Sequence, residues 1–201
     1  MRDKLYTIVY MIIITAVATG VMTGTKVALQ GRIELNEQML EHREQLRGLG
    51  ILKASEKADA QTVADLFETQ VVIETRDGRR FLYAYKDEDH KVLMAIGMEF
   101  EGEENWGPVR GVMSFTPDGR QIRALTILSH RETPGLGGRI TEAAFLEQFA
   151  DRNVPEPDAD GGIRIWQPTD AITGATRTSE SMEKILNQAV EDYMTLTGNQ
   201  D

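Results

Sequence analysis

Two short segments of this 201-residue chain hold the residues best suited to chemistry. The first reads HRETPGLGG over residues 130–138, and the second reads DAITGATRTS over residues 170–179. Both are rich in small residues, which leave the main chain open to close approach. The question that they raise is whether they are simple loops or hold a ligand.

The second segment leads directly into an expected helix. Gly174 and Ala175 expose the backbone, and Thr176 and Thr178 place hydroxyls beside the first helical turn. We expect the helix to run from Ser179, with Thr178 or Ser179 as its N-cap. Free amides and the helix dipole at such an end favour a phosphate. Taken alone, small polar residues before a helix are more often simple caps.

Composition excludes several kinds of chemistry. The net charge of -10, from 32 acidic and 22 basic residues, would repel nucleic acid, and we expect no nucleic-acid partner. The absence of cysteine excludes disulfides, zinc thiolate sites, iron–sulfur clusters and catalytic thiols. His42, His90 and His130 are scattered, so we expect no metal site. Redox chemistry would need an organic cofactor or a metal held by other ligands.

The N-terminal region reads as a membrane anchor. Residues 5–25 carry no charge, and the run is long enough to cross a membrane as a helix. Ala16 to Ala18 resemble a signal-peptide cleavage site, but the uncharged run continues well past them, so we favour a retained single-pass anchor. Positive charge at Arg2 and Lys4 predicts a cytoplasmic N-terminus. The body would then lie on the periplasmic or extracellular side of the inner (cytoplasmic) membrane.

The next region connects the anchor to the body. Leucine and methionine recur at helical spacing over residues 26–52, which we interpret as a solvated helical stalk. The polar stretch over residues 53–62 reads as a linker, or as the start of a brief second helix. We therefore divide the chain into a cytoplasmic N-terminus and anchor (1–28), a juxtamembrane helix and linker (29–68) and a folded domain (69–201).

The folded domain begins with apolar and polar residues in alternation, the pattern of strands. The turn residues Asp77-Gly78 and Pro117-Asp118-Gly119 predict two hairpins within a mostly antiparallel sheet over residues 69–130. Strands followed by packed helices predict an α+β domain behind a transmembrane helix. Beyond the sheet we expect a helix over residues 141–150, a short strand over residues 163–167 and the final amphipathic helix.

Both segments resemble the signatures of the FMN-binding domain family. DAITGAT, residues 170–176, resembles its flavinylation motif, an Asp followed by Ser or Thr, Gly, Ala and a final Thr. HRETPGLGGRI, residues 130–140, resembles its other signature, the ETPGLG loop. The resemblance covers residues 91–194 well, and the two motifs occur in the expected order behind an N-terminal anchor.

The resemblance implies that Thr176 carries FMN through a phosphoester, attached by a dedicated flavin transferase that recognises Asp170. Leu136 can cover an apolar ring face, and Thr133 can hydrogen-bond a polar edge. We expect no catalytic residue and no metal. The expected cofactor-binding residues are Thr173, Gly174, Ala175, Thr176 and Thr178 in the second segment, and Glu132, Thr133, Pro134, Gly135, Leu136 and Gly137 in the first. A side chain at Gly135 or Gly137 would clash with the flavin or force an unfavourable φ.

The resemblance also implies a role in electron transport. The family includes FMN-carrying subunits of two membrane complexes. One is the G-type subunit of the Rnf complex, which couples ferredoxin and NAD to an ion gradient, and the other is the C-type subunit of the Na+-translocating NADH:quinone reductase. We expect the Rnf type, with the other membrane subunits of the complex as partners and no separate catalytic activity. The C-type subunit, an FMN-binding module of another membrane reductase, and a non-redox domain with an unmodified Thr176 stay open as alternatives.

Overall fold

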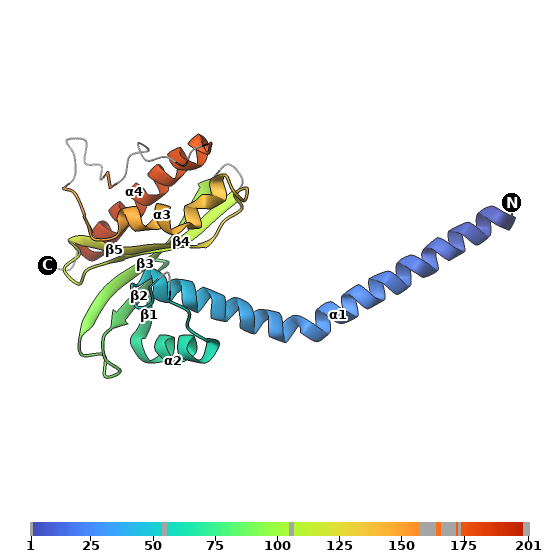
Figure 1. Cartoon of the computed structure of the whole chain (residues 1–201), viewed down its shortest axis with the longest axis horizontal. Coiled ribbons are helices and arrows are strands. Elements are labelled where there is room, and N and C mark those ends of the chain that lie inside the picture. Colours follow the sequence, from blue (N-terminus) through green and yellow to red (C-terminus); the bar gives the residue numbers. More distant parts are fainter. Residues whose placement is uncertain are drawn as a thin grey trace. The chain divides into compact units, whose positions relative to one another are not determined.

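The computed structural model describes residues 2–53, 56–104, 107–156, 164–165, 172 and 174–198. The chain divides into two compact units, residues 1–40 and residues 41–201. Helix α1, Arg2–Gly48, makes up the first unit and continues into the second (Figure 1).

The first unit exposes its apolar side chains. Tyr6, Ile12, Val17 and Met22 are between 61% and 75% exposed. The helix is long and apolar enough to cross a membrane, by its length and composition. This agrees with the anchor expected over residues 5–25.

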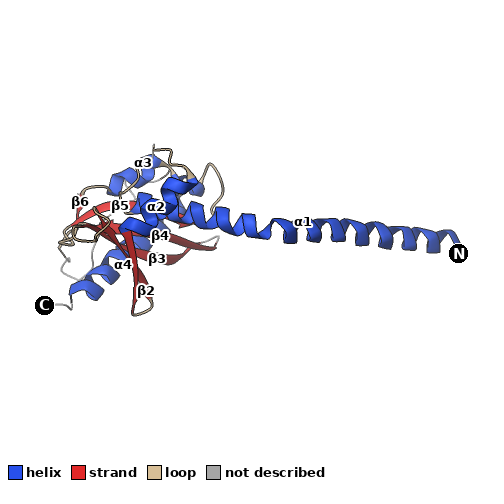
Figure 2. Ribbon diagram, turned by 90° about the horizontal axis from the view of Figure 1, so that it is seen from below, coloured by secondary structure: helices blue, strands red, loops and turns tan. Residues whose placement is uncertain are grey.

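The second unit is built on one antiparallel sheet whose strands follow chain order, so that each strand pairs with the one before it (Figure 2). The strands are β1 (Val71–Arg76), β2 (Arg79–Tyr85), β3 (Leu93–Glu104), β4 (Gly107–Phe115), β5 (Gln121–Ser129) and β6 (Arg152–Asn153). Between β1 and β2 the chain turns at Asp77 and Gly78, whose φ angles of 48° and 79° are those of a tight hairpin turn. The predicted α+β class and the sheet over residues 69–130 are confirmed.

Apolar clusters cover both faces of the sheet. On one face, Met113 shares a cluster with residues of α4 (Thr176–Gly198) and of the short helices η1 (Gly137–Thr141), α3 (Ala143–Leu146) and η2 (Glu147–Phe149). On the other face, Val112 shares a cluster with the end of α1 and with α2 (Ala60–Gln70). Val112 and Met113 are neighbours in β4, and both are fully buried. Because both faces are covered, β4 lacks the apolar–polar alternation of a half-exposed strand.

A glycine lets α4 approach the sheet closely. A Cβ on Gly102 of β3 would lie 2.4 Å from Cγ1 of Ile185, closer than side chains can come. Helix α4 therefore packs directly on β3. This contact fixes the helix whose first residue is Thr176.

The interpretation of residues 26–52 as a solvated stalk is wrong for its C-terminal part. From Glu41 onward the chain belongs to the second unit, and Leu46 and Leu49 are fully buried. The buried Gln45 donates a 3.0 Å hydrogen bond to Glu99 of β3. The spacing of the leucines is the same in a stalk and in a helix that covers a sheet, so the pattern alone did not distinguish the two.

Other boundaries also differ from the prediction. The expected helix over residues 141–150 is broken into η1, α3 and η2. Arg164 and Ile165 do not form the expected strand, and the rest of that strand lies outside the described residues. Strand β6, which was not expected, pairs with β5 at Gln121 and Ile122.

Candidate functional site

The flavinylation-like segment ends in a tight turn that places Thr176 at the start of α4. The amide of Ala175 donates to the carbonyl of Ile172 over 2.9 Å, and Gly174 has a φ of +83° that favours glycine. Ala175 is buried, whereas the side chain of Thr176 is exposed. The turn therefore presents the Thr176 hydroxyl to solvent at the N-terminus of a 23-residue helix.

Ser179 holds this turn together from within the helix. Its hydroxyl accepts a hydrogen bond from the amide of Ile172 at 3.2 Å and donates one to the carbonyl of Ala175 at 3.1 Å. The expected helix start at Ser179, with Thr178 or Ser179 as N-cap, is wrong, because α4 already begins at Thr176. Thr178 and Ser179 both lie within the helix, and their side chains are buried in the folded domain. The turn at Gly174, held by the Ser179 hydroxyl, precedes this earlier start.

The ETPGLG loop is a second tight turn. The carbonyl of Thr133 accepts hydrogen bonds from the amides of Leu136 (3.1 Å) and Gly138 (3.0 Å). Gly135 has a φ of +76°, and a Cβ there would meet open space. Leu136 leaves 48% of its surface exposed. Bare backbone and an exposed apolar side chain thus lie side by side in this loop.

The two loops meet in the folded structure. The Thr178 hydroxyl donates a 2.8 Å hydrogen bond to Oε2 of Glu132, and both side chains are buried. Leu136 lies against the other loop, since a Cβ on Gly174 would be 3.6 Å from its Cδ2. The sequence predicted these residues as one site, and the structure brings them together.

Gly137 is constrained by this junction. A Cβ there would lie 1.8 Å from Oε2 of Glu132 and 2.6 Å from Oγ1 of Thr178. The φ angle of Gly137 is not positive, so backbone conformation does not require glycine there. Glycine is needed because a side chain would collide with the carboxylate of Glu132. The expectation of an unfavourable φ holds at Gly135.

The described residues fit an FMN group at Thr176. The first amides of α4 have no partner within the helix and can donate to a phosphate. The exposed Leu136 offers an apolar surface, and Gly135 and Gly174 leave the backbone accessible. Among the described residues no group of His, Asp or Glu is arranged to hold a metal ion.

Some predicted residues are not placed, and some contacts were not foreseen. Asp170 and Thr173 lie outside the described residues, as do the two tryptophans, Trp106 and Trp166. Flavin contacts by Glu132, Thr133 and the other loop residues stay predictions. Sequence reasoning missed the Glu132–Thr178 bond, because no local pattern links residues 46 positions apart. It also took Ser179 for a cap or helix start and not for the partner of Ile172 and Ala175.

Comparison with known proteins shows the family of this chain. A family model described as FMN-binding domain matches residues 105–191. The G-type subunit of the ion-translocating oxidoreductase complex of Methanosarcina acetivorans is 30% identical over 191 residues, which cover 93% of this chain and 92% of that protein. The chain belongs to the FMN-binding domain family.

Two further relatives are matched over part of their length. The G-type subunit of the proton-translocating ferredoxin:NAD(+) oxidoreductase complex of Clostridium ljungdahlii is 31% identical over 61% of this chain and 64% of that protein. The C-type subunit of the Na(+)-translocating NADH-quinone reductase of Pasteurella multocida is 27% identical over 67% of this chain and 55% of that protein. The matched region is thus less than two thirds of either relative.

A solved structure shares the fold. It is the C-type subunit of the Na(+)-translocating NADH-quinone reductase of Parabacteroides distasonis, with a TM-score of 0.67 over 86% of this chain and 98% of that chain. The two sequences are 18% identical, so the likeness concerns the fold alone.

Proposed function

We propose that this chain is the membrane-anchored, FMN-carrying electron-transfer subunit of an ion-translocating complex of the Rnf type. The near full-length similarity to the G-type protein of Methanosarcina acetivorans supports this type, and the apolar part of α1 supports the anchor. Bound FMN supplies the redox chemistry, while the protein holds and orients it. The observation that carries the proposal is the junction of the two loops beside the exposed Thr176.

We assign the covalent attachment to Oγ1 of Thr176. Its exposure leaves it open to a flavin transferase, and the amides of the first helical turn can bind the phosphate after attachment. In the attachment step, an O–P bond forms between Oγ1 and the phosphorus of an activated FMN donor. The bond from phosphorus to the donor's leaving group breaks, and the hydroxyl proton passes to a base of the transferase.

Covalent attachment suits the proposed location. We place the anchor in the inner (cytoplasmic) membrane with the body on its periplasmic or extracellular side. Little free FMN is present there, so a non-covalent site that lost its flavin would stay empty. The other membrane subunits of the complex are the proposed redox partners.

A second candidate is the C-type subunit of a Na+-translocating NADH:quinone reductase. The similarity to the Pasteurella multocida protein supports it. The subunits that purify with the full-length chain from native membranes distinguish the two candidates. An FMN-binding module of a different reductase would bring neither set of partners.

Peptide mass spectrometry tests the attachment. The chain is expressed with and without a flavin transferase, and the peptide that contains Thr176 should gain one FMN less one water only when the transferase is present. Thr176→Ala should abolish covalent flavin, and Thr176→Ser, which keeps a hydroxyl, is the matched control. Flavin retained by Thr176→Ala after denaturation would show that another residue carries it.

Neighbouring variants separate attachment from recognition. Thr173→Ala and Thr178→Ala should keep at least part of the label, because neither removes Oγ1 of Thr176. Asp170→Ala should reduce labelling by weakening recognition by the transferase. Label mapped to Thr173 or Thr178 in the parent chain would contradict the assignment.

A further inference from the structure

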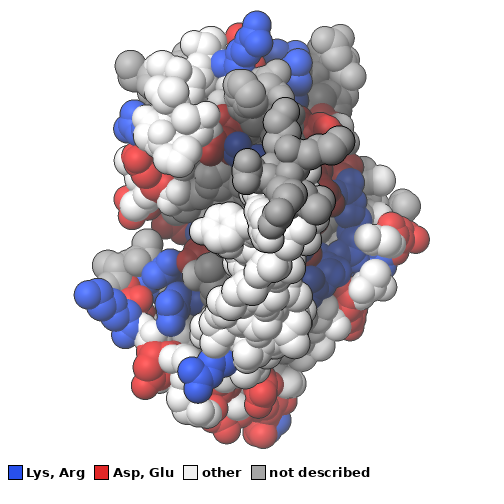
Figure 3. Space-filling model, turned by 90° about the vertical axis from the view of Figure 1, so that its right-hand side faces the viewer, with Lys and Arg blue, Asp and Glu red and all other residues white. Residues whose placement is uncertain are grey.

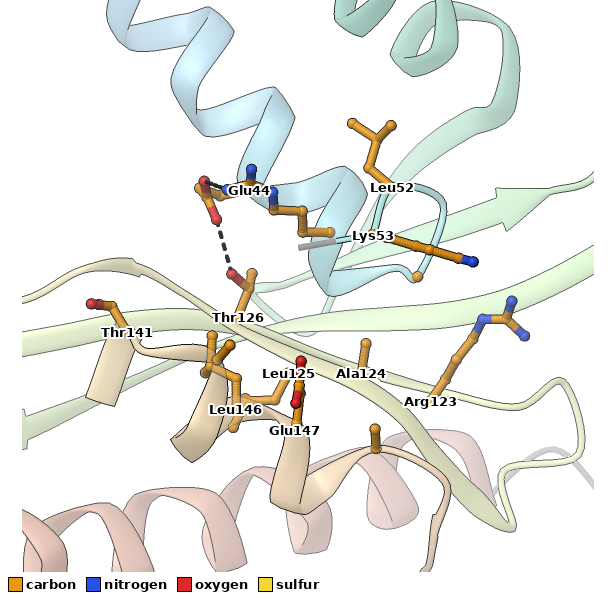
Figure 4. A pocket seen from close by; sticks show the side chains of 14 residues that line it. Glu44, Leu52, Lys53, Arg123, Ala124, Leu125, Thr126, Thr141, Leu146 and Glu147 are labelled. Carbon is orange, nitrogen blue, oxygen red and sulfur yellow. Dashed lines mark hydrogen bonds and ion pairs between the residues drawn. The ribbon is translucent and has the colours of Figure 1, made fainter. Parts of the chain in front are cut away.

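A groove separate from the loop junction lies in the second unit. It has a volume of about 710 Å³ and is lined by the end of α1 and the residues after it, by β5, and by the η1–α3–η2 segment. Figure 4 shows β5 running between the end of α1 and this segment. Leu125 and Leu146 supply apolar lining. The volume lies within the range of protein binding sites.

Two basic side chains line one end of the groove. Lys53 and Arg123 both line the groove, and in Figure 4 their side chains extend toward the same end. Among the described residues, neither has a carboxylate within ion-pair distance, and the buried Nε of Arg123 has no hydrogen-bond partner. The chain as a whole has a net charge of -10, and acidic and basic side chains are mixed over the face seen in Figure 3. A pair of free cations beside an apolar groove favours an anionic partner group.

The floor of the groove is the edge of the sheet. Strand β6 pairs with β5 at Gln121 and Ile122, so within the described structure the rest of β5 has β4 as its one neighbouring strand. Residues 123–126 of this edge line the groove. The main-chain groups of an edge strand are complementary to another extended peptide, which argues for a polypeptide occupant.

We propose that this groove is the docking site for an extended segment of another subunit of the complex. The segment carries an acidic side chain that pairs with Lys53 and Arg123, and apolar side chains that pack on Leu125 and Leu146. This docking rests on the proposed function, which supplies the partner subunits. It holds the FMN-carrying body against the complex through a surface distinct from the loop junction.

Charge reversal tests the docking in the intact complex. The tagged full-length chain is purified in mild detergent from membranes that contain all subunits, and the ratio of partner subunits to chain is measured. Lys53→Glu with Arg123→Glu should lower this ratio about tenfold or more, because it places like charges against the acidic segment. Lys86→Glu with Lys91→Glu makes the same change of charge on exposed side chains and should leave the ratio unchanged. Both variants should keep covalent flavin at Thr176, which reports an intact fold at the other site.

Photo-crosslinking tests the same groove without a charge change. A photo-reactive benzoylphenylalanine at position 147, an exposed groove residue, should crosslink to an extended segment of another subunit. The same group at position 91 should not. Crosslinks to lipid alone, or an unchanged subunit ratio in the Lys53→Glu, Arg123→Glu chain, would overturn the docking and leave the proposed function standing. Purification of the parent chain with no redox subunit would instead overturn the proposed function, and the docking with it.

Discussion

The hydroxyl of Thr178, in the first turn of α4, donates a hydrogen bond to Oε2 of Glu132 across 46 positions of sequence. Glu132 is 7% exposed and Thr178 is 5% exposed, so the bond is shielded from water. It ties the ETPGLG loop to the segment that presents Thr176. Because a buried carboxylate left without a donor is costly, this bond should fix the relative position of the two loops.

Removal of this bond should loosen the site without removing the attachment point. Thr178→Val should lower the free energy of unfolding by about 1–3 kcal/mol, since it leaves a buried carboxylate unpaired. Thr178→Ser keeps a donor and should cost less. Glu132→Gln keeps an acceptor oxygen and should retain more stability and more label at Thr176 than Glu132→Ala. Denaturant unfolding and the labelled fraction measure these effects, and equal stability of Glu132→Ala and the parent would contradict the role of the bond.

Gly137 should tolerate a side chain less well than Gly135. Gly137→Ala places a Cβ on the carboxylate of Glu132 and should destabilise by about 3 kcal/mol through overpacking. Gly135→Ala meets open space and should cost about 1 kcal/mol for its positive φ alone. Denaturant midpoints of the two variants provide the comparison.

The flavin spectrum gives a second measurement at Gly137. Gly137→Val should disturb the spectrum while Thr176 stays modified, provided that the transferase reads only the DAITGAT segment. A normal spectrum and a normal redox titration in this variant would count against the loop as part of the flavin site.

The end of α1 should contribute to the stability of the folded body. Leu46→Ala should lower the free energy of unfolding by about 2–5 kcal/mol, because Leu46 is fully buried against the sheet. Leu40→Ala, in the same helix but at a side chain that is 57% exposed, should change it by about 0.5 kcal/mol or less. Urea unfolding of the full chain in detergent, followed by tryptophan fluorescence, measures both. Similar values for the two variants would show that residues 41–52 behave as a stalk after all.

The topology has its own test. A reporter that is active only outside the cytoplasm, fused after Asp201, should be active in a membrane-bound fusion, because residues 5–25 are uncharged and follow a short basic leader. A cytoplasmic reporter at the same position is the control and should be silent. Recovery of mature protein that starts after Ala18 would replace the anchor with a cleaved signal peptide.

Local chemistry explains what the sequence predicted well. The β1–β2 hairpin follows from Asp77 and Gly78, whose residue types suit the positive φ angles observed there. The apolar-rich runs and the turn residues between them located β1 to β5, although β4 does not alternate. The two loops were identified by their residue types and by resemblance, and the structure joins them at Glu132 and Thr178.

What the sequence did not predict depends on contacts that form only in the folded chain. The start of α4 at Thr176 relies on the Ser179 hydroxyl, which bonds Ile172 and Ala175 only once the turn is formed. The burial of Leu46 depends on the face of the sheet that it covers. The Ser179 bonds are local but follow no apolar periodicity, and the sheet residues around Leu46 are distant in sequence, so the hydrophobic pattern carried no information about either.

The strand order also bears on how the protein matures. If the body is exported as proposed, behind an anchor whose N-terminus stays in the cytoplasm, each strand from β2 to β5 would reach the far side of the membrane just after the strand with which it pairs. The sheet can therefore form progressively during export, through contacts that are short in sequence. Helix α4, which carries Thr176 and packs back onto β3, would emerge last. A transferase that requires the folded turn would then modify fully exported chains alone, so covalent flavin would mark the completion of export.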